Sequence, residues 1–258
     1  MASDQLAKAP RGSARVPSIF NDAMGPVMRG PSSSHCAAAH RIGRLCLDLL
    51  DGEITSLVAH YDTNGALVTT HKGQGTDMGL YSGILGYEVD DDRLPNFSKG
   101  IAEAGIHVEV HYLDYGAAHP NTYKLSVANT TERHLIEAIS TGGGMIEIQK
   151  LDGASVLING DYFELIVFCG GSATEIAHYL GDALDCELLQ THSADTGDFV
   201  QVKSTTNFDL ELLKYLHNHD AVQSLRVLRP VLPILARSDL QVPFINCREM
   251  LEYNQNRG

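Results

Sequence analysis

The chain has 258 residues, 43% of them hydrophobic, which is enough for one large or two ordinary globular domains. Its 32 acidic and 19 basic side chains give a net charge of −13, which argues against nucleic acid or an anionic membrane as a partner. No apolar run has the length of a membrane span, and residues 1–17 lack the apolar core of a secretion signal. We therefore expect a flexible tail over 1–17, a cytoplasmic protein, and a small molecule or a protein as the partner.

Five cysteines are scattered along the chain without a C-x-x-C pair, so neither a disulfide framework nor a metal knuckle is predicted. Cys46 lies on the apolar face of a predicted helix and Cys169 ends a predicted strand, which favours core positions for both. The twelve histidines show no paired ligand spacing on a helix. No metal site is predicted within this chain.

The turn Gly30-Pro31-Ser32-Ser33-Ser34-His35 leads into a helix predicted over about 35–50, because apolar residues follow it at helical spacing. Ser34 is the expected N-cap. A helix start presents unpaired backbone N–H groups and partial positive charge, so a hydroxyl-rich turn there suits a carboxylate or a phosphate. The alternative is a polar loop with one capping serine.

A strand predicted over 54–61 turns at Asn64-Gly65 and returns over 66–70, which predicts a hairpin. The chain then enters His71-Lys72-Gly73-Gln74-Gly75-Thr76-Asp77, a second glycine-rich loop that opens onto a short helix ending at Gly86. Its glycines permit close approach of a ligand, its lysine supplies a cation, and its threonine or aspartate can cap the helix. The lysine precedes the glycines, which excludes a P-loop. A solvated glycine-rich turn is the alternative.

After an acidic turn at 90–92, strands are predicted over 108–112 and 123–127, with the turn His119-Pro120-Asn121-Thr122 between them. A helix is predicted over 132–140. Gly142-Gly143-Gly144 ends that helix, and another strand begins at 145. Residues 18–160 therefore form a predicted domain of open, mixed α+β pattern.

The pattern begins again at residue 161. A strand over 162–169 is followed by a Gly-Gly turn and by a capping-box sequence that starts at Ser172 and precedes a helix through 184. Strands near 187–191 and 199–203, a helix over 209–217 and a strand over 222–228 complete a βαββαβ, ferredoxin-like order. Residues 161–236 resemble an ACT domain in length and topology. The resemblance implies self-association through this unit and an amino acid bound near Gly170, Gly171 and Ser172.

Four stretches together resemble the β half of the iron-sulfur-dependent L-serine dehydratases. They occur in the family's order across residues 16–160 and are Ser18-Ile19-Phe20 through His35, then 72–77, 119–122 and 142–148. The ACT-like segment fits a known variant of the family. In that family the β region is similar to the allosteric substrate-binding domain of some phosphoglycerate dehydrogenases, and it lines the active site against an α region with a [4Fe-4S] cluster.

The resemblance implies a lyase. An iron of the cluster acts as a Lewis acid on the substrate hydroxyl while a base takes the α proton, and the product becomes a keto acid and ammonia. Scattered cysteines do not supply a cluster, so the resemblance implies that an α partner subunit binds it. Residues 237–258, with Val242-Pro243-Phe244 and 248–251, look like the start of the family's α region. The α region is then a separate chain, or this chain is a fragment.

The resemblance also implies the site residues. His35 and Lys72 are the expected catalytic residues, and the expected substrate-binding residues are Ser32, Ser33, Ser34, Gly73, Gln74, Thr76, Asp77, His119, Asn121 and Thr122. The chain departs from the family pattern at two positions, because Cys36 replaces a threonine and Gln74 replaces a histidine. Glutamine takes no proton at neutral pH, which leaves another base, another substrate or lost activity.

Two functions of different classes follow. The first is the β subunit of an iron-sulfur-dependent dehydratase or ammonia-lyase that eliminates water from L-serine or a related small β-hydroxy acid. The second is a non-catalytic amino-acid sensor, which Gln74 and the lack of cluster cysteines favour. The enzymatic hypothesis requires the 30–35 and 72–77 turns to meet at the starts of two neighbouring helices.

Overall fold

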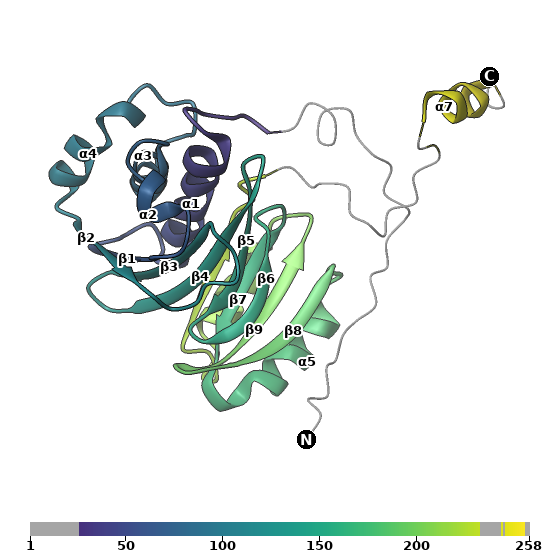
Figure 1. The fold of residues 1–258 in the computed structure, drawn as a ribbon. Coiled ribbons are helices and arrows are strands. Elements are labelled where there is room, and N and C mark those ends of the chain that lie inside the picture. Colours follow the sequence, from purple (N-terminus) through teal and green to yellow (C-terminus); the bar gives the residue numbers. More distant parts are fainter. Residues whose placement is uncertain (1–25, 233–243, 245, 256–258) are drawn as a thin grey trace.

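The computed structural model describes residues 26–232, 244 and 246–255. These residues form a mixed α and β structure with two sheets (Figure 1). The first sheet has six strands in the order β2-β1-β3-β4-β5-β6, and the second has four in the order β10-β7-β9-β8. The predicted tail over 1–17, the motif residues 18–20 and the stub residues 242–243 lie outside the described residues.

The first unit begins with helices and ends as a meander of strands. Its helical elements are the π-helical turn η2 (Ser33–Ala37), α1 (Ala38–Leu49), the single turn α2 (Leu67–Thr70), α3 (Thr76–Ile84), the 3-10 turn η3 (Leu94–Asn96) and α4 (Phe97–Ala104). Its strands are β1 (Ser56–Asp62), β2 (His107–Leu113), β3 (Thr122–Ala128), β4 (Arg133–Gly142), β5 (Met145–Leu151) and β6 (Ala154–Ile158). β1 runs parallel to β2, and every other neighbouring pair is antiparallel.

One face of this sheet carries the core. Alternate residues of β1, β3 and β4 are buried, because successive side chains of a strand point to opposite faces. α1 and α3 cover that face (Figure 1), and their apolar residues join the strands in one hydrophobic cluster. The opposite face carries polar side chains such as His60, Lys124 and Glu137.

α1 and α3 lie close together because glycines line their contact. A Cβ atom at Gly79 would overlap the carbonyl oxygen of Cys36, and a Cβ at Gly83 would overlap that of His40. The contacts advance in the same direction along both helices, so α1 and α3 are parallel and both begin at the same end. Only glycine permits this distance between the two backbones.

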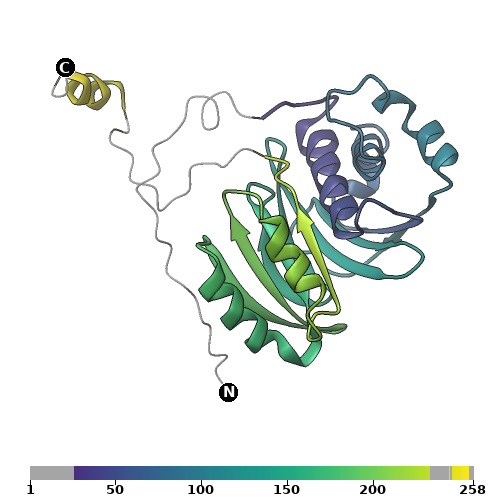
Figure 2. The same cartoon turned by 180° about the vertical axis from the view of Figure 1, so that it is seen from behind.

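The second unit has the predicted βαββαβ order. Its elements are β7 (Phe163–Phe168), the 3-10 turn η4 (Gly170–Ser172), α5 (Ala173–Ala183), β8 (Leu188–Ala194), β9 (Gly197–Ser204), α6 (Leu210–His217) and β10 (Ser224–Leu228). α5 and α6 lie side by side on one face of its sheet (Figure 2), over a second hydrophobic cluster. The other face contributes Phe168, Phe199 and Leu228 to the core of the first unit. α7 (Cys247–Gln255) buries none of its side chains.

The predicted hairpin over 54–70 is wrong. Residues 67–70 form the helical turn α2, and β1 pairs instead with β2 and β3. The Asp62 carboxylate accepts a hydrogen bond from the Asn64 N–H at 2.8 Å, and the Ala66 N–H donates to the carbonyl of Pro120 at 2.8 Å. These hydrogen bonds hold residues 64–66 beside the 119–122 turn, so the chain does not fold back along β1.

The predicted helix over 132–140 is also wrong, because these residues form β4. Ile136 and Ala138 are buried while Leu135 is 52% exposed, which is the alternation of a strand between two partners. Apolar spacing alone favoured a helix, and cross-strand pairing overrode it.

The predicted caps are wrong as well. Ser34 lies inside η2, preceded by Ser32 at the N-cap position. Gly75 holds the N-cap position of α3 at φ +87°, so neither Thr76 nor Asp77 caps that helix. Ser172 stands at the start of α5 without a side-chain cap bond, and the predicted capping box does not form.

Candidate functional site

Four motifs meet at one edge of the six-stranded sheet. β1 and β2 end there, because Asp62 pairs with Leu113, and β3 begins there, with Thr122 beside Ile139 near the end of β4. The triglycine turn 142–144 joins β4 to β5 at the same edge. α1 and α3 begin there too, since η2 packs against β4 and Tyr61 near the end of β1 contacts His71 just before α3.

The two predicted turns touch each other. A Cβ atom at Gly75 would lie 2.9 Å from Cδ of Pro31 and 3.2 Å from Cβ of Cys36. The 30–35 and 72–77 turns therefore sit side by side at the starts of two parallel helices. The positive ends of the two helix dipoles make this edge favourable for an anion.

His35 is positioned by Ser32. The Ser32 hydroxyl lies 3.0 Å from Nδ1 of His35, and the Ser32 carbonyl accepts the N–H groups of His35 and Cys36 at 3.2 and 2.7 Å. Burial lowers the pKa of His35, which keeps the imidazole neutral near pH 7. Its Nε2 is buried without a hydrogen-bond partner among the described residues. Burial also raises the pKa of the Cys36 thiol to about 11, so this cysteine is no thiolate.

The 119–122 turn faces the same region. The His119 Nδ1 accepts the Asn121 N–H at 3.1 Å, and the Thr122 hydroxyl donates to the His119 carbonyl at 2.6 Å, so both side chains hold the turn itself. Asn121 accepts the Ser140 N–H through its carbonyl at 3.1 Å. Oδ1 of Asn121 and Oγ of Ser140 are buried, and the described residues offer neither of them a partner.

The 72–77 loop divides into an open and a buried part. Lys72, Gly73 and Gln74 are exposed, and Lys72 forms no ion pair with another described residue. Thr76 and Asp77 are buried. The Asp77 carboxylate lies 2.8 Å from Nδ1 of His71, which is itself buried. The structure thus brings the predicted residues of three motifs to one edge, while Ser33 and Ser34 are half-buried within η2.

Sequence reasoning missed three residues of this edge. His71 was not singled out, although it directly precedes the lysine of the loop. Tyr112 was assigned only to a strand, but alternation along β2 places it on the inner face near the carboxyl end of that strand, where loops of mixed sheets bind ligands. Ser140 lay within the segment that we predicted as a helix, so its place beside Asn121 could not be seen.

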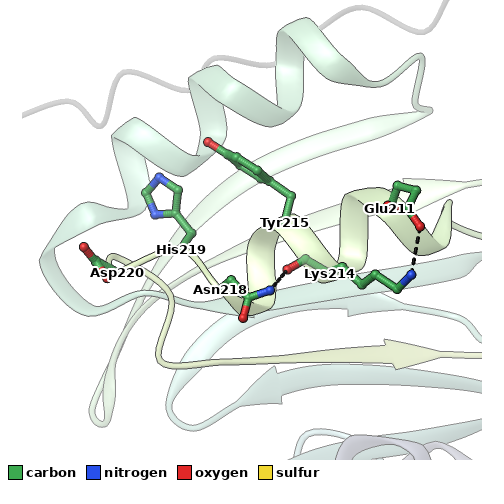
Figure 3. Close-up of a pocket in the computed structure, with 6 residues that line it drawn as sticks. All are labelled: Glu211, Lys214, Tyr215, Asn218, His219 and Asp220. Atoms are coloured by element: carbon green, nitrogen blue, oxygen red, sulfur yellow. Dashed lines mark hydrogen bonds and ion pairs between the residues drawn. The ribbon is translucent and has the colours of Figure 1, made fainter.

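Other predicted features lie elsewhere. Gly170, Gly171 and Ser172 form the turn η4 between β7 and α5, as predicted. A cavity of about 510 Å³ opens on α6, lined by six side chains that include Tyr215 and His219 (Figure 3). A second cavity, of about 350 Å³, lies between α1 and residues 229–231. Neither cavity contains a predicted site residue.

No helix in the described part of the chain combines the length and the apolar character that a membrane span needs. Within the same residues, no three histidine, cysteine, aspartate or glutamate side chains are grouped closely enough to hold a metal ion.

Comparison with known proteins gives two curated relatives. The Bacillus subtilis (strain 168) protein named "Probable L-serine dehydratase, beta chain" is 38% identical over 151 residues, which are 58% of this chain and 67% of that protein. The Peptoniphilus asaccharolyticus "L-serine dehydratase, beta chain" is 33% identical over 149 residues, 57% of this chain and 66% of that protein. The matches thus span about two thirds of each relative. No family model matches the chain. On its identity to these relatives, the chain belongs to the family of L-serine dehydratase beta chains.

Proposed function

We propose that this chain is the substrate-binding β subunit of a lyase that eliminates water from L-serine or a related small β-hydroxy acid. The observation that carries the proposal is a set of three buried polar atoms, at the sheet edge where the four motifs meet, for which the described residues offer no hydrogen-bond partner. They are Nε2 of His35, Oδ1 of Asn121 and Oγ of Ser140. A buried polar atom without a hydrogen bond costs about 1–3 kcal/mol, so three of them beside two helix starts favour a polar ligand.

Each part of a small amino acid finds a complement at this edge. The helix starts and the exposed Lys72 suit the carboxylate. If the Ser32 hydroxyl donates to Nδ1 of His35, the neutral imidazole carries its proton on Nε2 and donates to the ligand. Oδ1 of Asn121 accepts from an ammonium or a hydroxyl group. We assign these residues to binding and orientation.

The described residues do not fit an iron-sulfur cluster. The described residues hold no group of three or more possible metal ligands, and burial raises the pKa of the Cys36, Cys46 and Cys169 thiols to about 11, 12 and 11. Cluster ligands are grouped thiolates. We propose that an α partner subunit carries the [4Fe-4S] cluster, in keeping with the "beta chain" names of the two relatives.

Reconstitution tests the proposal. The full chain is co-expressed anaerobically with a partner chain that bears clustered cysteines and is encoded beside it, and release of keto acid from L-serine is followed. We expect a stable complex that forms pyruvate, while either chain alone forms none. A complex that forms no keto acid from L-serine, L-threonine or another small β-hydroxy acid would refute the proposed activity.

An amino-acid sensor is the second candidate, and Gln74 favours it, because an exposed amide stands where the family resemblance implies an imidazole. Calorimetry on the full chain separates the two candidates. Tight binding of an amino acid without any partner, together with no activity in the complex, would favour the sensor. Self-association through the second unit remains a prediction for either candidate.

A further inference from the structure

A buried imidazole at the sheet edge bridges a carboxylate and a phenol. His71 is 3% exposed, and its Nδ1 lies 2.8 Å from Oδ1 of Asp77. Its Nε2 lies 2.7 Å from the hydroxyl of Tyr112. The three residues come from the end of α2, the first turn of α3 and the end of β2. The Asp77 N–H also donates to the His71 carbonyl at 3.1 Å, so backbone and side chain fix the same geometry.

The chemistry of the three groups sets the direction of the hydrogen bonds. An ionised carboxylate only accepts, so the proton of a neutral His71 lies on Nδ1 and points to Asp77. Nε2 then presents its lone pair to the Tyr112 O–H. In this arrangement His71 can accept the proton of the Tyr112 hydroxyl, while Asp77 orients the imidazole. The Tyr112 oxygen can then take a proton from a bound molecule.

Solvent exposure distinguishes Tyr112 from the other two members of this hydrogen-bonded group. Tyr112 is 45% exposed, whereas His71 and Asp77 are 3% and 9% exposed. The His71 ring lies against Tyr112, with ring centroids 5.8 Å apart, and against the core residue Tyr61, with centroids 5.4 Å apart. Of the three residues, Tyr112 is therefore the one that solvent or a ligand can reach.

We infer that Asp77, His71 and Tyr112 form a proton relay and that Tyr112 is the general base of the site. The inference rests on the proposed function. The Tyr112 oxygen takes the α proton as the C–H bond breaks, and its own proton passes to Nε2 of His71. The electron pair of the C–H bond forms the Cα–Cβ double bond, and the β-hydroxyl leaves as hydroxide with its bonding pair. Asp77 stabilises the resulting imidazolium.

Activity of the reconstituted complex gives the first test. Tyr112→Phe and His71→Gln should each lower kcat about 100-fold or more, the usual contribution of general acid–base catalysis, with KM nearly unchanged. The double variant should be no worse than either single one, because the relay acts as a unit. Tyr215→Phe is the matched control, since Tyr215 is 46% exposed on α6 (Figure 3) and should keep full kcat. Unchanged kcat in both single variants, or losses that multiply in the double variant, would overturn the relay.

A second test needs no activity. In the full chain labelled with ¹⁵N-histidine, the nitrogen shifts of His71 should identify the tautomer protonated at Nδ1. Tyr112→Phe should shift the Nε2 resonance and leave the Nδ1 proton in place, whereas Asp77→Asn should change the tautomer. A His71 protonated at Nε2 in the unaltered chain overturns the relay. If the tautomer is as expected but the unaltered complex forms no keto acid, the proposed function fails, and the role of Tyr112 as a base fails with it.

Discussion

At the scale of single residues, the candidate site contains buried polar atoms that find no hydrogen-bond partner among residues 26–232, 244 and 246–255. Such atoms are rare in native proteins because each costs about 1–3 kcal/mol. The Ser140 N–H donates to the Asn121 carbonyl, yet the side-chain oxygens of both residues have no hydrogen-bond partner in the described part of the chain. Binding of a polar ligand, as proposed above, would supply hydrogen bonds to this pair of oxygens.

Asn121→Ala tests this reading. The KM for the substrate should rise about five- to tenfold, because one hydrogen bond of about 1–1.5 kcal/mol is lost. The free energy of unfolding should not fall, since Oδ1 has no partner among the described residues and the backbone bonds remain. Steady-state kinetics of the complex and thermal unfolding measure the two effects.

Asn129→Ala is the control for Asn121→Ala. The Asn129 side chain accepts the N–H groups of Thr131 and Glu132 at 2.9 Å each in the turn between β3 and β4. This change should lower stability and leave KM as it is. Equal loss of stability in both variants, with KM unchanged, would assign Asn121 to the fold.

At the scale of elements, the glycine contact between α1 and α3 positions the two turns. Parallel helices that begin together place their N-terminal N–H groups beside each other, which one helix alone does not achieve. The distance between the two helix backbones depends on Gly79 and Gly83. The site is therefore sensitive to residues that never touch a ligand.

Gly79→Ala should separate the helices. The added Cβ meets the Cys36 carbonyl, which is backbone and cannot turn away, so we expect a loss of about 1–3 kcal/mol in unfolding free energy, as for an overpacked core. KM should rise as well, because η2 moves away from the 72–77 loop.

Gly181→Ala in α5 is the matched control. A Cβ there has only Leu189 at 4.0 Å, so this variant should be as stable as the unaltered chain or more stable, since alanine favours helices. Normal stability and KM in Gly79→Ala would refute the claimed contact.

At the scale of the whole molecule, the two sheets share a core and a polar rim. His134 stacks on Phe168 with ring centroids 5.1 Å apart, and its Nδ1 lies 2.7 Å from the Asp152 carboxylate. At the rim, Arg226 pairs with Glu132, and Arg229 pairs with Asp48 of α1. The second unit is thus joined to the helix that carries the first turn of the site.

Asp48→Asn should weaken the junction between α1 and the second unit, which the ion pair of Asp48 with Arg229 forms. The Asp48 carboxylate, 6% exposed, accepts the Arg229 backbone N–H at 2.8 Å and its guanidinium at 2.5 Å. We expect unfolding free energy to fall by about 1–2 kcal/mol, because hydrogen bonds to a charged group are lost while Arg229 stays largely in water. Glu88→Gln removes an exposed ion pair with Arg44 and should change stability by less than about 0.5 kcal/mol. Chemical denaturation compares the two, and equal effects would contradict the importance of the junction.

The stability of the protein should depend on pH through His40. Burial lowers the pKa of His40 below 6.5, and its Nε2 donates to the Tyr87 carbonyl at 2.8 Å. The unfolded chain therefore binds a proton at higher pH than the folded one. The stabilisation is complete above pH 6.5 and is lost as the pH falls below it.

His40→Gln tests this dependence. Glutamine keeps a donor for the Tyr87 carbonyl and does not titrate. The unfolding free energy of the unaltered chain minus that of His40→Gln should decrease between pH 7.5 and 5. A constant difference, measured by chemical denaturation over this range, would show that His40 does not titrate on unfolding.

The sequence by itself determined the family and the mixed α+β class, because these depend on residue identity and on spacing between near neighbours. The resemblance to the dehydratase β half, read from the motifs, is confirmed by the two relatives. Prediction was wrong where the local sequence pattern fitted both a helix and a strand. Residues 133–142 form a strand because they pair with β3 and β5.

Only the tertiary structure decided which motifs meet. The 30–35 and 72–77 turns converge because α1 and α3 pack through glycine, and spacing along the chain does not contain that contact. His71 and Tyr112 are 41 residues apart in the chain, and their contact depends on β2 lying parallel to β1. Long-range contacts arise from packing and burial of the whole chain, which is why the motifs were recognised from the sequence while the contact between His71 and Tyr112 was not.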